Sequence, residues 1–257
     1  MAQDAELAFD YRTSHTSPGK SARYDRLYRP GTALGFYWER FERPYLAGLF
    51  ARLAAEHPAG RYLDFATGTG RILDVGAEWF RDATGIDVSE SMLDLARRKR
   101  PGATIICGDV LTDPVDLEPF DVITLFRFLV RAGDLREQIL GWLRGVIRAD
   151  GVLIVNNHRN AVSLRGMIFR LRRRLHPSGI DHEILSDREV RAMLERTGFE
   201  VVEAYGFGLV PSFRGRLIFP APVLEATERR LSGAGRLARF AKNRIYVCRP
   251  IDQPTRA

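Results

Sequence analysis

Long apolar runs and cysteines are the scarcest features of this 257-residue sequence. No stretch of about 18 uncharged apolar residues occurs, which excludes a membrane-spanning helix. The first residues, MAQDAELAFDYRTSH, are acidic and polar, unlike the basic and then apolar start of a signal peptide, so we expect a cytoplasmic protein. Cys107 and Cys248 each lie in an apolar, strand-like run, which favours reduced structural thiols over a disulfide or a metal cluster.

Lysine is also rare, because the basic residues behind the net charge of +7 are nearly all arginines. Most of them are dispersed among acids, so charge alone is weak evidence for a nucleic-acid partner. The stretch 163–179, SLRGMIFRLRRRLHPSG, differs because its apolar residues recur at helical spacing while its arginines take other faces. This basic amphipathic helix either packs on its own core or contacts an anionic substrate or membrane surface.

From residue 61 onward, short β-type runs alternate with helical patterns, which is typical of βαβ units and a mostly parallel sheet. Strands are predicted at 61–66, 82–87, 103–109, 120–126, 151–157, 199–207 and 244–250. Helices are predicted at 71–80, 89–100, 135–147 and 186–198. The last of these has Ser186 and Glu189 at capping-box spacing and Gly198 as its stop signal.

Three segments lie outside this rhythm, at 1–57, 159–185 and 207–243. Ligands of open α/β sheets bind beyond the carboxyl ends of the strands, so we expect these segments to cover a substrate. The sequence therefore predicts a single domain over 1–257. It comprises an N-terminal helical cap (1–57), a cofactor-binding core (58–158), and a part with the substrate-cap insertions and the last two strands (159–257).

A loop of small residues in YLDFATGTGRIL, residues 62–73, indicates that a ligand approaches the backbone closely. A nucleoside-triphosphate loop would need a lysine after Gly70, and none is there. A dinucleotide loop would need a third glycine where Leu73 stands. The remaining pattern, Asp64 followed by Gly68 and Gly70, resembles motif I of class I S-adenosylmethionine-dependent methyltransferases.

Evenly spaced acids support this resemblance. Asp87 follows Asp64 by 23 residues and Asp109 follows Asp87 by 22, so each lies one βα unit further on. A carboxylate at the end of the second strand can accept both ribose hydroxyls, and Asp109 would meet the adenine amino group. The cofactor-binding residues that the resemblance implies are Asp64, Phe65, Ala66, Thr67, Gly68, Gly70, Asp87, Val88, Met92, Asp109, Val110 and Phe126.

The resemblance covers roughly residues 60–160 and implies an α/β fold. We expect a Rossmann-like, seven-stranded, mostly parallel sheet with helices on both faces and an antiparallel last strand. It also identifies Arg148 to Gly151 as the turn between a helix and the fifth strand. Ala66 replaces the usual first glycine and Thr67 a frequent cysteine, but both are small, so we expect S-adenosylmethionine as the cofactor.

The class of methyl acceptor can be inferred by excluding acceptors whose characteristic sequence motifs are missing. Motifs for methylation of base amino groups, cytosine C5 and protein arginine are missing, and Arg127 stands where a metal-assisted enzyme would want an aspartate. This favours methyl transfer to an oxygen or nitrogen of a small molecule, a sugar or a lipid-linked acceptor, with no metal. An RNA or other nucleic-acid methyltransferase and a catalytically silent cofactor-binding scaffold remain the alternatives.

Individual acceptor-site residues follow from their positions. His158, just past the fifth strand, is the candidate general base, although a structural histidine is an equal alternative. Arg127 either holds a carboxylate or phosphate of the acceptor or pairs with a nearby acid. The candidate substrate contacts are Tyr11, His15, Tyr24 and Asn157, with Tyr28, Asn156 and His182 as weaker candidates.

Overall fold

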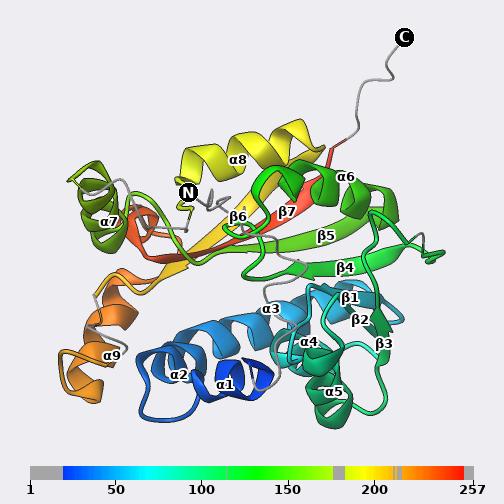
Figure 1. Cartoon of the computed structure of the whole chain (residues 1–257), viewed down its shortest axis with the longest axis horizontal. Helices are drawn as coiled ribbons and strands as arrows, with labels where there is room; N and C mark the ends of the chain where they lie inside the picture. The colour runs from blue at the N-terminus through cyan, green and yellow to red at the C-terminus, as the bar shows by residue number, and fades with distance from the viewer. Residues whose placement is uncertain (1–19, 114, 176–182, 211, 213–215, 252–257) are drawn as a thin grey trace, which may run out of the picture.

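One seven-stranded sheet organises the chain, in the order β3-β2-β1-β4-β5-β7-β6 (Figure 1). The computed structural model describes residues 20–113, 115–175, 183–210, 212 and 216–251. The strands are β1 (Arg61–Phe65), β2 (Asp82–Asp87), β3 (Thr104–Cys107), β4 (Phe120–Leu125), β5 (Ile147–Asn157), β6 (Phe199–Phe207) and β7 (Asn243–Pro250). The first five strands pair in parallel, and β7 runs antiparallel to both β5 and β6. The predicted fold class is confirmed.

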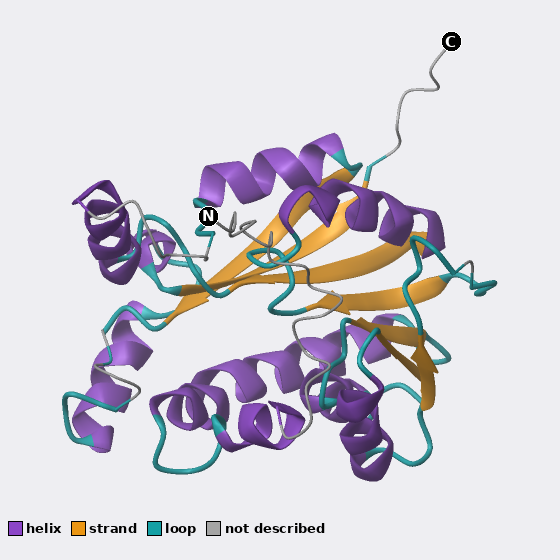
Figure 2. Ribbon diagram, in the orientation of Figure 1, coloured by secondary structure: helices purple, strands orange, loops and turns teal. Residues whose placement is uncertain are grey.

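Helices cover both faces of the sheet (Figures 1 and 2). They are α1 (Lys20–Arg26), α2 (Ala33–Tyr37), a π-helical turn η1 (Trp38–Glu42), α3 (Arg43–Glu56), α4 (Arg71–Gly76), α5 (Glu90–Lys99), a 3-10 turn η2 (Gly133–Leu135), α6 (Arg136–Val146), α7 (Leu164–Leu175), α8 (Asp187–Arg196), α9 (Ala221–Leu231) and a 3-10 turn η3 (Arg236–Phe240). In Figure 1, α6 and α8 lie on one face and α3 and α4 on the other.

Two apolar cores lie on the two faces because successive side chains of a strand point in opposite directions. In β1, Tyr62 belongs to the core under α3, and Leu63 belongs to the core under α6 and α8. In β4, Val122 and Ile123 divide in the same way. Burial on both faces explains why these parallel strands read as nearly continuous apolar runs.

Two predicted boundaries were wrong. The helix expected over 71–80 ends at Gly76, where a Cβ would lie 2.1 Å from the Tyr62 ring, so the helix end packs directly on β1. The turn expected at Arg148 to Gly151 is part of β5, which starts at Ile147 and accommodates the extra residues by a register shift against β4. The capping box of Ser186 and Glu189 is confirmed, as is the stop at Gly198, which has a φ of 87°.

Both cysteines are free thiols. Cys248 is buried in β7, whereas Cys107 is exposed on the edge strand β3, so only Cys248 has the packed environment expected of a structural thiol. Within the described ranges, no helix is both long enough and apolar enough to cross a membrane.

The strand order places the ends of β1 and β4 at the point where the connections turn to opposite sides of the sheet. β1 continues outward to β2 and β3, and β4 continues outward to β5. A crevice at such a point, beyond the carboxyl ends of the strands, is where open α/β sheets bind ligands. The loops that leave β1, β2, β4 and β5 line one cavity there.

Candidate functional site

The cavity has a volume of about 560 Å³ and two chemically different sides. The loops after β1, β2 and β3 form one side, which we call the cofactor side, with Asp64, Asp87 and Asp109 among its lining residues. The other, which we call the acceptor side, is formed by α1, the segments after β4 and β5, the start of α7 and the residue before β7. Its polar groups are mainly cationic.

The glycine loop is held in a conformation that requires glycine. Gly68 and Gly70 have φ angles of 54° and 76°, in the left-handed region that side chains disfavour. A Cβ on Gly70 would lie 2.8 Å from the Cβ of Ala96, so the loop packs directly on α5. Gly70 does not line the cavity, so its predicted cofactor contact is corrected to a packing role.

Ala66 occupies the first small position of the loop with a φ of 56°. This value is left-handed, and alanine there carries a steric cost that glycine would not. We expected that alanine, being small, would still allow the cofactor to bind in place of the usual glycine. The small side chain does leave the cavity open, but its backbone conformation is strained.

Asp64 is buried beneath the loop, and both carboxylate oxygens accept hydrogen bonds. The Thr67 hydroxyl and the Leu73 amide donate to Oδ2 at 2.5 and 3.0 Å, and the Thr124 hydroxyl donates to Oδ1 at 2.7 Å. Burial raises the pKa of Asp64 to about 6, an increase that these three hydrogen bonds limit. Asp64 thus ties the loop to β4, a positioning role beside its place in the cavity wall.

Asp87 lies at the end of β2 with its carboxylate toward the glycine loop. Its Oδ2 accepts from the Gly68 amide at 2.8 Å, and its Oδ1 accepts from the Ser89 amide at 2.9 Å. Burial raises its pKa, and the backbone hydrogen bonds oppose that rise. Because each carboxylate oxygen can accept a second hydrogen bond, Asp87 offers acceptors for two neighbouring hydroxyl groups.

The remaining predicted cofactor residues all line the cavity, and all except Phe126, which follows β4, belong to the cofactor side. They are Phe65, Ala66, Thr67, Gly68, Val88, Met92, Asp109, Val110 and Phe126. Met92, Val110 and Phe126 are buried, which suits packing against a flat apolar ring. This set matches the shape and polarity of an adenosyl group: an open glycine backbone, two carboxylates and apolar walls.

Arg127 follows β4 with a φ of 57°, an uncommon backbone conformation for a long side chain. Its guanidinium lies 3.8 Å from the buried Glu42 carboxylate and 5.2 Å from the centre of the Tyr28 ring. Arg71 shares both partners, at 3.3 Å from Glu42 and 4.1 Å above Tyr28. Pairing with an acid, one of the two predicted roles of Arg127, is therefore present, while the residue also lines the cavity.

His158 lines the cavity and is 7% exposed. Its Nδ1 is buried and has no hydrogen-bond partner among the described residues. Burial lowers its pKa well below the usual value, and the nearby charges of Arg127, Arg159 and Lys242 lower it further. The imidazole is therefore neutral at pH 7, with a ring nitrogen that can accept a proton.

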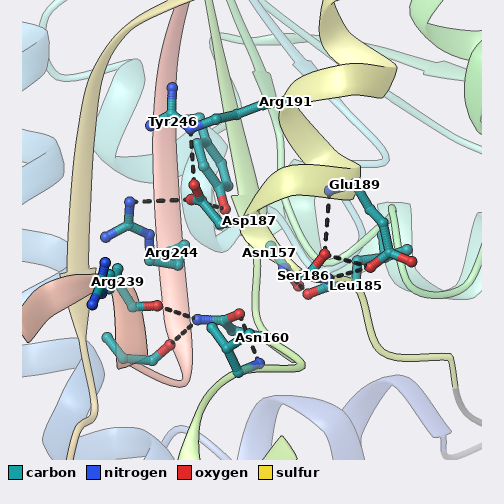
Figure 3. A network of polar contacts seen from close by, with 12 residues as sticks. Asn157, Asn160, Leu185, Ser186, Asp187, Glu189, Arg191, Arg239, Arg244 and Tyr246 are labelled. Carbon is teal, nitrogen blue, oxygen red and sulfur yellow. Dashed lines mark hydrogen bonds and ion pairs between the residues drawn. The ribbon is translucent and has the colours of Figure 1, made fainter.

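Asn157, a predicted substrate contact, is not among the residues that line the cavity, and it belongs to the network of polar contacts in Figure 3. Its side chain is fully buried, its Nδ2 donates to the Leu185 carbonyl at 2.8 Å, and its Oδ1 accepts from the Arg159 amide. Both polar atoms of the Asn157 side chain are hydrogen-bonded to the backbone, so the predicted substrate contact is corrected to a structural role. Asn156 is buried as well, and its Nδ2 donates to the Arg244 carbonyl.

Tyr24 lines the acceptor side, and its hydroxyl lies 3.4 Å from that of Tyr28, which also lines the cavity. Tyr11, His15 and His182 lie outside the described residues. Within the described part of the chain, no group of three or more histidine, cysteine, aspartate or glutamate residues is arranged to hold a metal ion.

The sequence did not single out several residues of the acceptor side, although all of them except Arg131 lie in the segments 159–185 and 207–243 that we expected to cover a substrate. They are Arg131, Arg159, Asn160, Ser163, Phe169, Ile184 and Lys242. Asn160 fixes this side, because its Nδ2 donates to the carbonyls of Arg239 and Ala241 at 2.7 and 2.8 Å (Figure 3). These hydrogen bonds connect the end of β5 to the segment that contains Lys242. No local sequence pattern predicts them.

Comparisons with known proteins agree with this geometry. A family model described as a methyltransferase domain matches residues 63–151. An uncharacterized methyltransferase of Oceanobacillus iheyensis is 26% identical over 100 residues, 38% of this chain and 47% of that protein. The demethylmenaquinone methyltransferase of Renibacterium salmoninarum is 32% identical over 98 residues, 38% of this chain and 41% of that protein. The match thus spans less than half the length of each of these relatives.

Solved structures share the fold over most of their length. The magnesium protoporphyrin IX methyltransferase of Synechocystis PCC 6803 with bound S-adenosylhomocysteine has a TM-score of 0.64 at 17% identity, covering 93% of this chain and 97% of that one. A methyltransferase of Thermotoga maritima has a TM-score of 0.57 at 18% identity, covering 89% and 94%. The family model thus identifies a methyltransferase domain at residues 63–151, and the solved methyltransferases share the fold that surrounds it.

Proposed function

We propose that this protein transfers the methyl group of S-adenosylmethionine to an oxygen or nitrogen of a small acceptor, which can be a metabolite, a sugar or a lipid-linked molecule. The observation that carries the proposal is a single cavity whose two sides differ in chemistry. The acidic cofactor side has the open glycine backbone and ribose acceptors, and it continues into a cationic side with His158. Methyl transfer needs both ligands in one water-poor space.

The chemistry requires alignment and, for a hydroxyl acceptor, a base. Bound S-adenosylmethionine supplies an electrophilic methyl group. Asp87 and Asp109 would hold the nucleoside, and Asp64 would hold the loop beneath it. Neutral His158, through its unpartnered Nδ1, would accept the proton that an acceptor hydroxyl loses.

Calorimetric titration tests the first half of the proposal. We expect micromolar binding of S-adenosylmethionine and S-adenosylhomocysteine and no heat from NAD. Binding of NAD alone would contradict the assignment of the glycine loop. Binding of both adenosyl ligands without turnover on any acceptor in a broad screen would favour a silent cofactor-binding protein.

We also propose that α7 contacts an anionic lipid surface beside the cavity. Five of its large apolar residues are about half exposed or more, whereas Phe169 is less exposed and lines the cavity: the five are Leu164, Met167, Ile168, Leu171 and Leu175. Arg172, Arg173 and Arg174 occupy the last turn of the same helix. An exposed apolar stripe flanked by arginines suits the boundary between acyl chains and anionic headgroups.

The helix is also next to the cavity. Ser163, Arg165, Gly166 and Phe169 line the acceptor side, so a lipid-linked acceptor would enter where the helix meets the surface. Gly166, the one buried residue of α7, permits this position because a Cβ there would lie 2.3 Å from the Asn160 carbonyl oxygen.

Vesicle co-sedimentation tests the lipid contact. We expect binding to phosphatidylcholine vesicles that contain phosphatidylglycerol, weakening at high ionic strength, and little binding to phosphatidylcholine alone. Changing both Leu171 and Leu175 to glutamine should lower binding by about tenfold or more, since two apolar side chains leave the interface. Val202→Gln, at an equally exposed apolar residue of β6, is the matched control. Equal binding to both vesicle types would contradict the proposal.

A further inference from the structure

Five cations from segments far apart in the sequence meet on the acceptor side of the cavity. They are Arg127, Arg131, Arg159, Arg165 and Lys242. β4 ends just before Arg127, β5 just before Arg159, and the first turn of α7 holds Arg165. Lys242 immediately precedes β7. The five cations therefore lie together because of the sheet topology, and not because they are adjacent in the sequence.

Among the described residues, three of these cations have no carboxylate within ion-pair distance, although the charge of Glu42 opposes the lowering of the pKa of Lys242. Glu42 lies beside Arg127 and Arg71, and it is already shared between them. Across the described ranges, no carboxylate oxygen lies within 4 Å of the cationic groups of Arg159, Arg165 or Lys242. The acids of the cavity, Asp64, Asp87 and Asp109, belong to the cofactor side.

The uncompensated charges act on one another. Burial and then the charges of Arg165, Arg127 and Arg159 lower the pKa of Lys242 to about 7. Burial and then Arg131, Arg165 and Arg127 lower the pKa of Arg159 to about 10. Each cation is thus close enough to oppose the charge of the others, a cost that an anion placed among them would remove.

The backbone at the start of α7 adds to the positive electrostatic potential of the acceptor side. The start of α7 faces the cavity, with Ser163 and Gly166 in its wall, and the Ser163 hydroxyl accepts from the Gly166 amide at 3.0 Å. A helix N-terminus carries a partial positive charge and spare amide donors. The unpartnered Nδ1 of the buried His158 lies in the same wall. Guanidinium, ammonium and helix amides together are the donors that oxyanions prefer.

We infer that the acceptor side is an oxyanion subsite in which Lys242, Arg159 and Arg165, with the N-terminus of α7, bind a phosphate or carboxylate group of the methyl acceptor. This inference rests on the proposed function, which identifies the molecule that carries the phosphate or carboxylate as the methyl acceptor. It restricts the methyl acceptor to anionic molecules. The bound anion would neutralise the cations around His158 and thereby make that imidazole a stronger base.

Lysine-selective NMR tests the subsite, because the chain has three lysines, Lys20, Lys99 and Lys242. With ¹³C-labelled lysine, one ε-carbon signal should titrate near pH 7 in phosphate-free buffer and should disappear in Lys242→Met. Inorganic phosphate should move that titration upward by about one pH unit or more and leave the signal of Lys99, which pairs with Asp25, in place. Succinate in a parallel titration distinguishes carboxylate from phosphate preference.

Variants decide whether the binding is specific. Lys242→Met and Arg159→Gln should each weaken phosphate binding about tenfold or more, as expected for loss of a charged hydrogen-bond donor, while Lys99→Met should not. An effect of phosphate no larger than that of chloride at equal ionic strength would overturn the inference, as would phosphate binding that survives both variants.

S-adenosylhomocysteine titration of the same variants separates this inference from the proposed function. Retained cofactor binding with lost phosphate binding is the expected result. Phosphate binding at Lys242 in a protein that binds no adenosyl ligand would refute the proposed function and leave the anion site standing.

Discussion

The two sides of the cavity are built in opposite ways. The cofactor side comes from successive βα units between residues 61 and 113, and its characteristic charges are acidic. The acceptor side is assembled from α1, the ends of β4 and β5, the start of α7 and the residue before β7, and its charges are basic. The first is a local pattern that repeats along the chain, whereas the second exists only after the sheet has formed.

Hydrogen bonds show this difference directly. Asp87 accepts from Ser89 and Gly68, 2 and 19 residues away, and Asp64 accepts from Thr67 and Leu73, 3 and 9 residues away, with one longer-range bond from Thr124, 60 residues away. On the acceptor side, Asn160 donates to carbonyls 79 and 81 residues away. Disturbing one side should therefore leave the other largely intact, and the predictions below test that separation.

The largest expected effect concerns Lys242 and the pH dependence of stability. An unfolded lysine has a pKa near 10.4, so between about pH 7 and pH 10 the unfolded chain binds a proton that folded Lys242 does not. Its contribution makes the free energy of unfolding rise with pH across this window, by about 1 kcal/mol per unit, and level off below pH 7. In Lys242→Met this contribution disappears.

The measurement is denaturant unfolding of wild type and Lys242→Met at several pH values, since the difference between them cancels the other titrating groups. Saturating phosphate should flatten the wild-type dependence. Parallel curves for the two proteins would show that Lys242 is not buried among like charges. Lys99→Met is the matched control, since Lys99 pairs with Asp25 outside the cavity.

The next effect concerns Asp87. Asp87→Ala should weaken S-adenosylhomocysteine binding by about 1 to 3 kcal/mol, because a bound ribose loses its acceptors. Phosphate binding on the acceptor side should not change. Calorimetry measures both, and Asp82→Ala, at the exposed start of the same strand, is the control. Unchanged cofactor affinity would refute the role of Asp87, and loss of both affinities would refute the independence of the two sides.

The smallest effect concerns the strained loop. Ala66→Gly should raise the free energy of unfolding by about 0.5 kcal/mol, because relief of the left-handed strain exceeds the entropy that glycine adds to the unfolded chain. Thermal unfolding measures the change, with Ala77→Gly as control, since Ala77 has a φ of −68°. A destabilised Ala66→Gly protein would mean that the φ of 56° carries no strain.

Sequence patterns predicted the sheet well, and they brought the predicted carboxylates to one cavity, because both depend on spacing. Alternation of short apolar runs with helical patterns located the strands, and the carboxylates follow the strand ends at regular intervals. The errors fell where packing decided the outcome. The Tyr62 ring meets the backbone of Gly76 where α4 ends, and a shifted pairing with β4 turned Arg148 to Gly151 into strand.

The acceptor side was predicted only in part. His158 and Arg127 were identified because each follows a predicted strand directly, and both line the cavity. Asn157 was assigned to the substrate for the same reason, but its side-chain amide donates to the Leu185 carbonyl. Lys242 lies in the segment 207–243 that we expected to cover a substrate, but no local pattern singled it out, because its cationic neighbours come from α7 and from the segments after β4 and β5.

By itself the sequence determined the class of fold and the strand ends, and it predicts where an adenosyl ligand would meet the glycine loop. These depend on the backbone preferences of glycine and on side-chain periodicity, which act over a few residues. Only the tertiary structure decided which charges face the acceptor, since Coulomb interactions depend on distance in space and the sheet order sets those distances. The antiparallel return of β7 places Lys242 beside the ends of two parallel strands, and the chemistry of the acceptor side follows from that position.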